Sequence, residues 1–301
     1  MRRPTGREKR CIRQILRMLQ LSEMQVHASD IVLPPKKLHA MIKFKPLFKE
    51  CTSYPPGTTY TYLPHPYYVH KESLPLAIFN DHRFAFFYWT LWKRGSQVLP
   101  DLVTLDWHQD LVYPGEAEKK ELEQLDMNDS FEVSFFTWAR LNPLNDNHIV
   151  SAMYRNIIGN AYVICKQNRY TDYEDETIKD MFNNEHVIKK FHTTQEAYDY
   201  LSDTDVQSVC FDIDLDYFTI TNPSVTGWDK PTFIKESAIK SIMDPTSDFM
   251  HWVFQRIKGF TIALEPSFVG GLTKAMRLFG VVERTLFTGS IQQKDTTWRH
   301  F

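Results

Sequence analysis

Short apolar runs alternate with helix-length stretches from residue 74 to residue 287. Runs of strand length occur at residues 74–79, 101–108, 161–165, 207–215 and 260–265. Stretches with the helical spacing of apolar positions occur at residues 81–94, 193–201, 231–243, 247–257 and 272–287. Strands that alternate with helices in this way predict an α/β fold with a largely parallel sheet.

The first two of these strands have the spacing of a βαβ unit. Asn80 can cap a helix that follows the run 74–79, and this helix stops at Gly95, shortly before the run 101–108. A crossover of this kind connects parallel strands. We therefore expect the two strands to be parallel neighbours in the sheet.

The pattern of apolar and polar positions is least clear in the first 70 residues. The stretch 54–68, "YPPGTTYTYLPHPYY", is typical of an irregular loop because Pro and Gly interrupt it. The arginine-rich residues 1–21 have the character of a basic helix at the solvent edge. No linker or internal repeat divides the chain. We therefore expect a single domain over residues 1–301, with residues 1–70 as an N-terminal extension of uncertain structure.

Composition narrows the class of protein. With 43% hydrophobic and 14% aromatic residues, the chain can bury a substantial core. A formal net charge of −2 gives no electrostatic reason to expect a nucleic-acid partner. The longest apolar run, Phe84–Trp92, has nine residues, whereas a bilayer needs roughly 20, so we expect no membrane partner. The four cysteines form no CxxC pair, which favours a reducing, cytoplasmic location.

Candidate chemistry follows the carboxyl ends of the predicted strands. The polar residues there are His82, Asp106, His108, Asp110, Asp212, Asp214, Asp216 and Glu265. In a parallel sheet these ends meet at one edge, where ligands bind. Side chains two residues apart on an extended chain share a face, so Asp106, His108 and Asp110 should converge, as should the three aspartates of "FDIDLD".

Carboxylates gathered at one edge need a cation among them, because buried like charges repel each other and lose their hydration. A divalent metal supplies that charge. Oxygen and imidazole ligands without thiolate favour manganese over zinc, and the set is large enough for two ions. Two ions about 3.5 to 4 Å apart can share a water and lower its pKa. The pattern therefore predicts a metal-dependent hydrolase.

Two other interpretations of "FDIDLD" explain less. A calcium loop that starts at Asp212 needs glycine at its sixth position and glutamate at its twelfth, where this chain has Tyr217 and Pro223. The stretch also looks like the nucleophile motif of haloacid-dehalogenase-type phosphatases. That assignment leaves the "DWHQD" motif at residues 106–110 without a role.

Three motifs together resemble the ureohydrolase pattern of arginases and agmatinases, with its GGDH-type histidine, DxHxD motif and SxDxD motif. They are His82 in "NDHRFA", "DWHQD" at 106–110 and "FDIDLD" at 211–216. The chain is most similar to the divergent arginase-related family that includes peptide arginases, which convert arginine side chains in ribosomally made peptides to ornithine. The resemblance covers the motif cores between residues 76 and 272. It implies a three-layer α-β-α fold of the arginase/deacetylase type.

The same resemblance implies two manganese ions and a set of protein ligands. One ion would take His82, Asp106, Asp110 and Asp212, and the other would take Asp106, His108, Asp212 and Asp214. In this arrangement Asp106 and Asp212 bridge the two ions. Asp216 would orient a ligand from behind.

Catalytic roles are implied for Glu265, His148 and Asp110. Glu265 falls where these enzymes keep a glutamate for the substrate guanidinium, whose N–H donors match a carboxylate; the alternative is a cap for the helix that follows. His148 would carry a proton to the leaving amine, and the alternative is a histidine satisfied within the core. Asp110 would combine metal binding with catalysis.

The chain departs from the arginases that act on free arginine. Phe79 and Asn80 replace the glycines before the histidine, and residues 111–120, "LVYPGEAEKK", replace the polar residues that hold the amino and carboxylate groups of arginine. We therefore expect an arginine-containing peptide as substrate, with ornithine and urea as products. The alternatives are a deacetylase-like amide hydrolase of the same fold, which usually needs one metal, and a non-catalytic metal-stabilised peptide-binding module. The sequence leaves the oligomeric state open.

Overall fold

The computed structural model describes most of the chain after residue 53. The described residues are 54–68, 72–94, 96, 98–167, 174–220, 231–291, 293 and 295–299. The basic helix expected at residues 1–21 lies outside them, as does most of the predicted N-terminal extension.

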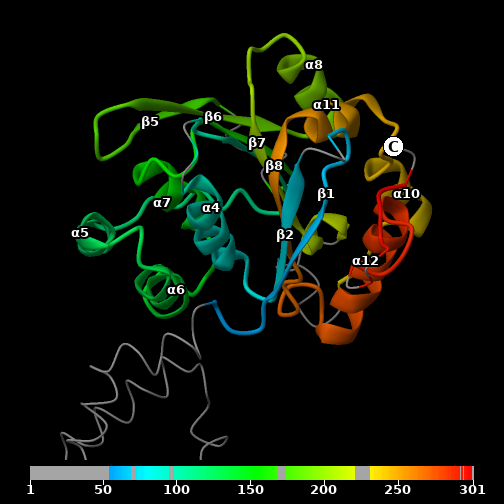
Figure 1. Cartoon of the computed structure of the whole chain (residues 1–301), viewed down its shortest axis with the longest axis horizontal. Helices are drawn as coiled ribbons and strands as arrows, with labels where there is room; N and C mark the ends of the chain where they lie inside the picture. Colours follow the sequence, from blue (N-terminus) through cyan, green and yellow to red (C-terminus); the bar gives the residue numbers. More distant parts are fainter. Residues whose placement is uncertain are drawn as a thin grey trace, which may run out of the picture.

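One sheet runs through the described part of the chain (Figure 1). Its strands are β1 (Thr59–Pro64), β2 (Ser73–Phe79), β3 (Asp101–Asp106), β4 (Ala161–Cys165), β5 (Glu176–Lys179), β6 (Glu185–Phe191), β7 (Val209–Asp214) and β8 (Ile257–Ala263). They form an eight-stranded sheet in the order β1-β2-β8-β7-β3-β4-β6-β5. The six inner strands are parallel, while β1 and β5 are antiparallel edge strands. The prediction of an α/β fold with a largely parallel sheet is confirmed.

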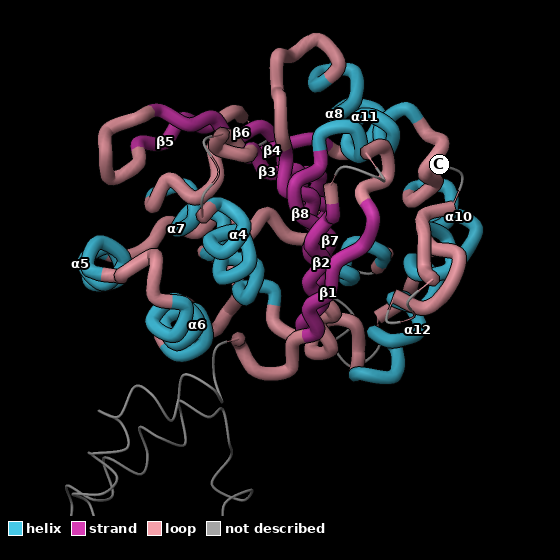
Figure 2. Tube along the Cα trace, in the orientation of Figure 1, coloured by secondary structure: helices cyan, strands magenta, loops and turns pink. Residues whose placement is uncertain are grey.

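Helices cover both faces of the sheet (Figure 2). One face carries α4 (Ala85–Lys93), α5 (Glu116–Gln124), α6 (Ser130–Ala139) and α7 (His148–Tyr154), and the other carries α8 (Thr194–Leu201), α10 (Glu236–Ile242), α11 (Asp248–Arg256) and α12 (Leu272–Leu286). Each face has its own cluster of buried apolar side chains. The sheet and the helices on its two faces thus form three layers. Within the described residues, no helix combines the length and the apolar character needed to cross a bilayer.

Alternation along the inner strands separates apolar from polar positions. Val103 and Leu105 of β3 pack in the cluster on the α11 side, as do Phe211 and Ile213 of β7. The residues between them, including Thr104, therefore point to the α4 side. Near the carboxyl ends of the strands this second face becomes polar, and the candidate site forms there.

The expectation that the strands 74–79 and 101–108 are neighbours is wrong. Both strands exist as β2 and β3, and they are parallel, but β8 and β7 lie between them. A βαβ connection determines the relative direction of two strands and does not require that they touch. The two later strands fill the gap because nearly every side chain in them is buried, which suits the middle of a sheet.

Residues 59–64, which the sequence analysis assigned to a loop, form β1. This strand lies at the edge of the sheet and ends in Pro64, a position that tolerates proline because one side of an edge strand has no partner in the ladder. The hairpin of β5 and β6 and the helices α5, α6 and α7 were also not predicted. β8 begins at Ile257, three residues before the predicted start, and ends at Ala263.

Helix α4 packs closely on the sheet at a glycine. A Cβ atom added to Gly259 of β8 would lie 2.0 Å from Cε3 of Trp92, so the indole occupies the space that any side chain here would need. Trp92 also donates a hydrogen bond from Nε1 to the hydroxyl of Tyr60, at 3.3 Å, which connects α4 to the edge strand β1.

Gly259→Ala should lower the free energy of unfolding by about 1 to 3 kcal/mol, because the new methyl group overpacks the interface between α4 and β8. Urea unfolding of both proteins measures the difference. Gly115→Ala is the matched control, because Gly115 has φ −68° and open space around its Cβ position. That change should stay within about 0.5 kcal/mol. Equal stability of the Gly259 variant and the parent would contradict the packing described here.

Candidate functional site

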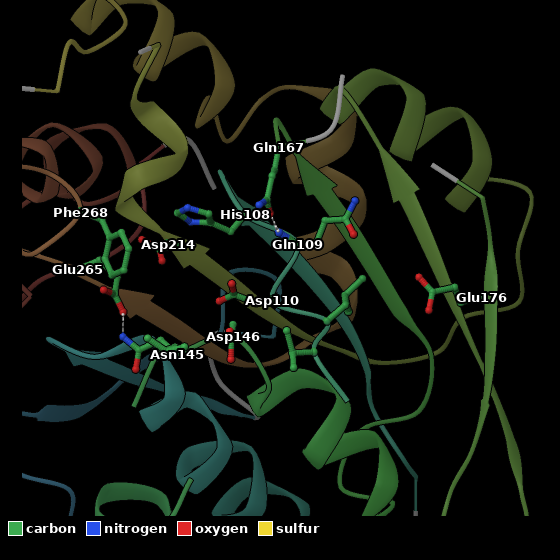
Figure 3. A pocket seen from close by; sticks show the side chains of 13 residues that line it. His108, Gln109, Asp110, Asn145, Asp146, Gln167, Glu176, Asp214, Glu265 and Phe268 are labelled. Atoms are coloured by element: carbon green, nitrogen blue, oxygen red, sulfur yellow. Dashed lines mark hydrogen bonds between the residues drawn. The ribbon is translucent and has the colours of Figure 1, made fainter. Parts of the chain in front are cut away.

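The site lies where four neighbouring parallel strands end. β2, β8, β7 and β3 are consecutive in the sheet, and their carboxyl ends meet at one edge. The short 3-10 helix η1 (His82–Phe84) follows β2 and places His82 there, and η2 (Leu215–Phe218) follows β7 and places Asp216 there. The loop between α6 and α7 adds Asn145 and Asp146, which lie near Glu265 and Asp110 (Figure 3).

His82 lies at the centre of the cluster and is fully buried. Its Nδ1 atom faces three carboxylate oxygens, Asp110 Oδ2 at 3.0 Å, Asp214 Oδ2 at 3.3 Å and Asp106 Oδ2 at 3.4 Å. Its Nε2 atom lies 2.7 Å from Asp212 Oδ2 on the opposite side of the ring. One imidazole therefore joins four aspartates from two segments of the chain, residues 106–110 and 212–214.

Asp212 is held differently from the other aspartates. Thr104 donates a hydrogen bond to its Oδ2 atom at 2.7 Å, and Thr261 donates one to its Oδ1 atom. Both oxygens of this carboxylate therefore accept hydrogen bonds from threonines on neighbouring strands, and Oδ2 also contacts His82 Nε2. A buried carboxylate on the far nitrogen of a histidine fixes the tautomer and orientation of the ring, and this is the position of Asp212. The resemblance instead implied that Asp212 bridges two metal ions.

His108 and Asp216 form a second pair within the cluster. His108 Nδ1 lies 2.9 Å from Asp216 Oδ2, and the backbone N–H of His108 donates to Asp106 Oδ1 at 2.7 Å. Asp216 Oδ1 in turn accepts from the backbone N–H of Trp107 at 3.1 Å. Asp216 therefore lies where a metal ligand could lie beside His108, whereas the sequence predicted only that it orients another ligand.

The convergence of the "DWHQD" residues does not arise from strand alternation. β3 ends at Asp106, and Asp110 has a φ of 52°, so the chain has already turned before it reaches this residue. Asp110 meets His82 because the loop folds back over the sheet edge. The prediction that these side chains come together is correct, but its geometric reason is wrong beyond Asp106.

Among the described residues, three groups of histidine and aspartate side chains have possible ligand atoms within 4.8 Å of one another. They are His82, Asp106 and Asp214; Asp106, His108 and Asp216; and His82, Asp110 and His148. Asp106 belongs to two of these groups. Its Oδ2 atom is buried and accepts no hydrogen bond from the described residues. Such an oxygen, among carboxylates and imidazoles without thiolate, suits a hard divalent cation.

Burial and mutual repulsion raise the pKa values of two aspartates of the cluster, Asp106 and Asp214. The pKa of Asp106 lies well above its usual range because of burial and the charges of Asp110 and Asp216. Burial and the charges of Asp216 and Asp106 also raise the pKa of Asp214 well above its usual range. Without a metal, the surroundings therefore favour the protonated forms of these two carboxyl groups, and an added cation would favour their ionised forms.

The neighbouring aspartates raise the pKa values of two histidines, His82 and His108, so that their protonated rings offset negative charge in the cluster. Burial alone would lower the pKa of His108, but Asp216 and then Asp106 outweigh this effect and raise it to about 10. Burial also opposes a charge on His82, whose pKa is nevertheless raised well above its usual range, chiefly by Asp212. His108 in turn overcomes the effect of burial on Asp216 and lowers the pKa of that carboxyl group.

Glu265 is a buried carboxylate beside this cluster, two residues beyond the end of β8. Its Oε1 atom accepts hydrogen bonds from the backbone N–H of His82 at 2.5 Å and from Asn145 Nδ2 at 2.6 Å. Burial and the charge of Asp214 raise its pKa well above the usual range. Glu265, Asn145 and Asp110 all have positive φ values, of 38°, 62° and 52°. Such backbone conformations are rare outside glycine and gather at functional sites.

A pocket with a volume of about 480 Å³ opens over the cluster. Figure 3 shows Asp214, Asp110 and His108 on its floor, with Glu265 and Phe268 on one side. Its charged or titratable lining residues are His108, Asp110, Asp146, Glu176, Asp214 and Glu265, without lysine or arginine among the described residues. The pocket therefore suits a positively charged ligand.

His148 lies behind His82 and does not line this pocket. Its ring packs against His82, with centroids 4.2 Å apart, and against Trp89, at 5.6 Å. Its Nδ1 atom lies 3.0 Å from the carbonyl oxygen of Asn145, which accepts a hydrogen bond from it, and its Nε2 atom is buried without a partner among the described residues. Burial, with the charge of His82, lowers the pKa of His148 well below its usual range. Proton transfer by His148 stays a prediction.

No protein-family model matches this chain, and no curated protein has a significantly similar sequence. Within the chain, the structure gathers most of the predicted residues into one cluster. They are His82, Asp106, His108, Asp110, Asp214 and Glu265. Asp212 and His148 contact the cluster from behind His82.

Four polar residues of the site were not predicted from the sequence. Thr104 was detectable, because it lies two positions before Asp106 and so shares its face of β3. Thr261 became visible only through the register that places it opposite Asp212. Asn145 and Asp146 lie on a loop whose position follows from the packing of α6 and α7, and no motif marks them.

The metal-free protein should lose about 1 to 2 kcal/mol of unfolding free energy between pH 7 and pH 9. The folded pKa of His108 is about 10, against an ordinary value of 6.5, so above pH 6.5 the folded state holds a proton that the unfolded state lacks. Stability from this group is therefore lost as the pH rises toward 10. Urea unfolding in the presence of a chelator measures the slope.

His108→Gln should flatten this pH dependence. His192→Gln is the control, because His192 is an exposed histidine outside the site, and it should leave the slope unchanged. The same slope in the His108 variant as in the parent would contradict the pairing of His108 with Asp216.

Proposed function

We propose that this protein is a metal-dependent hydrolase that removes the amidino group of an arginine side chain in a peptide, giving ornithine and urea. One observation supports this function above the others. An acidic pocket without lysine or arginine in its described lining leads to a buried glutamate directly beside a cluster of carboxylates and imidazoles. In this proposal the three-layer arrangement is of the arginase/deacetylase type.

Two groups of side chains are the candidate holders of two manganese ions. Asp106 would be shared by them, with His82 and Asp214 on one side and His108 and Asp216 on the other. Asp110 adds a further carboxylate near His82. When bound, such ions lower the pKa of a water and supply the nucleophile for hydrolysis. More carboxylates gather here than one ion needs, which favours two ions over the single-metal deacetylase alternative.

Glu265 is the residue that binds the guanidinium of the substrate. Its Oε1 atom is fixed by His82 N–H and by Asn145, so the carboxylate is positioned before substrate arrives. A guanidinium is permanently charged and presents paired N–H donors to a carboxylate. Bound there, its carbon would lie next to the metal-binding cluster, and water would displace the side-chain amine from that carbon.

The substrate is an arginine whose carboxylate is not free. A free amino acid brings a negative charge into the pocket, and within the described lining no lysine or arginine could pair with it. Burying an unpaired charge among like charges is strongly unfavourable. A peptide bond removes the charge from that group, which supports a peptidyl arginine.

The direct test is to incubate the manganese-loaded protein with peptides that each contain one arginine and to follow ornithine by mass spectrometry and urea by a colorimetric assay. Formation of both products in equal amounts supports the proposal. Turnover of acyl-lysine peptides instead would support the deacetylase alternative. Peptide binding with bound metal but without any turnover would support the binding module.

Glu265→Gln should keep both metal ions yet lower kcat/KM for a peptidyl arginine by about 100-fold or more, because only the charge that pairs with guanidinium is removed. Glutamine can still accept the two hydrogen bonds from His82 N–H and Asn145. Metal content is measured by mass spectrometry of the metal ions, and turnover by urea release. Full activity of this variant would remove Glu265 from substrate binding.

Asp106→Asn should abolish binding of both ions, because Asp106 belongs to two ligand groups.

Asp216→Asn should reduce the metal content to one ion per chain, because Asp216 belongs to only one of the two groups. Asp212→Asn should keep two ions with an affinity lowered by about 10- to 100-fold, because Asp212 orients His82 and offers no free oxygen. Loss of an ion in the Asp212 variant, together with two ions in the Asp216 variant, would favour the ligand set implied by the resemblance.

A further inference from the structure

The pocket contains one carboxylate that the proposed reaction does not employ. Asp110 and Asp214 belong to groups that suit a metal, and Glu265 would bind the guanidinium. Glu176 is already paired with Lys190 and accepts a hydrogen bond from Tyr113. Among the charged residues of the lining, this assignment leaves Asp146.

Asp146 is held in place without a positive partner. Its Oδ1 atom accepts a hydrogen bond from Asn142 Nδ2 at 2.8 Å, and its backbone carbonyl accepts one from Val112 N–H at 2.8 Å. Among the described residues it forms no ion pair. Burial and then the charge of Asp110 raise its pKa, and the charge of His108 offsets only part of this effect. The side chain is thus fixed by neutral groups.

Asn145, the residue before Asp146, provides an independent sign of a missing ligand. It also lines the pocket and is only 8% exposed. Its Nδ2 atom donates to Glu265, whereas its Oδ1 atom is buried and has no hydrogen-bond partner among the described residues. A buried polar atom of this kind is rare and calls for a donor that is absent from the protein itself. Figure 3 shows both residues on one wall of the pocket.

We propose that Asn145 and Asp146 form a subsite for an ammonium group of the substrate, adjacent to the guanidinium that Glu265 binds. An ammonium carries one positive charge for Asp146 and three N–H donors, enough for both oxygens of the wall. The proposal rests on the proposed function, and it specifies the substrate as a peptide in which a lysine lies next to the modified arginine.

Apolar residues at the mouth of the pocket fit the rest of such a side chain. Val112 and Leu144 are exposed there, at 48% and 69%, and Leu111 is half-buried. A lysine can lay its methylene groups along this apolar surface while its ammonium reaches Asp146. The subsite would therefore select the neighbour of the arginine by both charge and shape.

The test compares two peptides that differ only in the residue next to a single arginine, lysine in one and its uncharged analogue norleucine in the other. The parent protein should prefer the lysine peptide by about tenfold in kcat/KM, the effect of one hydrogen-bonded charge pair. Asp146→Asn should reduce this ratio to about one. Glu185→Gln is the control, because it removes the same charge from an exposed position outside the pocket, and it should keep the full preference.

Equilibrium binding of the two fluorescently labelled peptides, measured by anisotropy, separates this proposal from the proposed function. Tighter binding of the lysine peptide that depends on Asp146, without urea release, would support the subsite and reject the hydrolase. Urea release with equal kcat/KM for both peptides would support the hydrolase and reject the subsite. A lysine preference that persists in the Asp146 variant would also overturn the subsite.

Discussion

Buried negative charge at the carboxyl edge of the sheet is the constraint on which the site depends. The parallel strands bring aspartates together there, and the fold holds each one with a specific donor. Asp212 receives two threonine hydroxyls from its neighbouring strands. Asp216 receives a backbone N–H and the ring of His108. These donors neutralise part of the charge, and the oxygen of Asp106 that remains without a donor shows where compensation is incomplete.

One face of the sheet forms an apolar core, and the other face carries the polar cluster at the carboxyl ends of the strands. On the α11 side, apolar side chains of β3 and β7 build a continuous core. On the α4 side, the same strands turn polar toward their carboxyl ends, so the polar cluster lies on strands whose opposite face is packed in the core. Residues with unusual backbone conformations, among them Asp110 and Glu265, lie in the connections just beyond the strands. Local strain is tolerated there because the surrounding packing over-determines the chain.

The charge of the pocket links this architecture to the class of ligand that fits it. Glu265, Asn145 and Asp146 all line the pocket. Asn145 donates a hydrogen bond to Glu265 and directly precedes Asp146 in the chain. A ligand that brings positive charge completes this wall, and a ligand that brings a carboxylate opposes it. The same surplus of negative charge that suits a divalent cation in the cluster therefore also favours cationic groups in the pocket.

Much of the fold and half of the site follow from the sequence alone. The alternation of strands and helices determined the α/β class, and the motifs around His82, Asp106 and Asp214 indicated the edge at which the reactive groups gather. Adjacency of strands, and with it the pairing of Thr261 with Asp212, was decided only by the tertiary structure. The physical reason is that periodicity reports which face a residue occupies. Which partner it meets across that face depends on register and on the packing of distant loops.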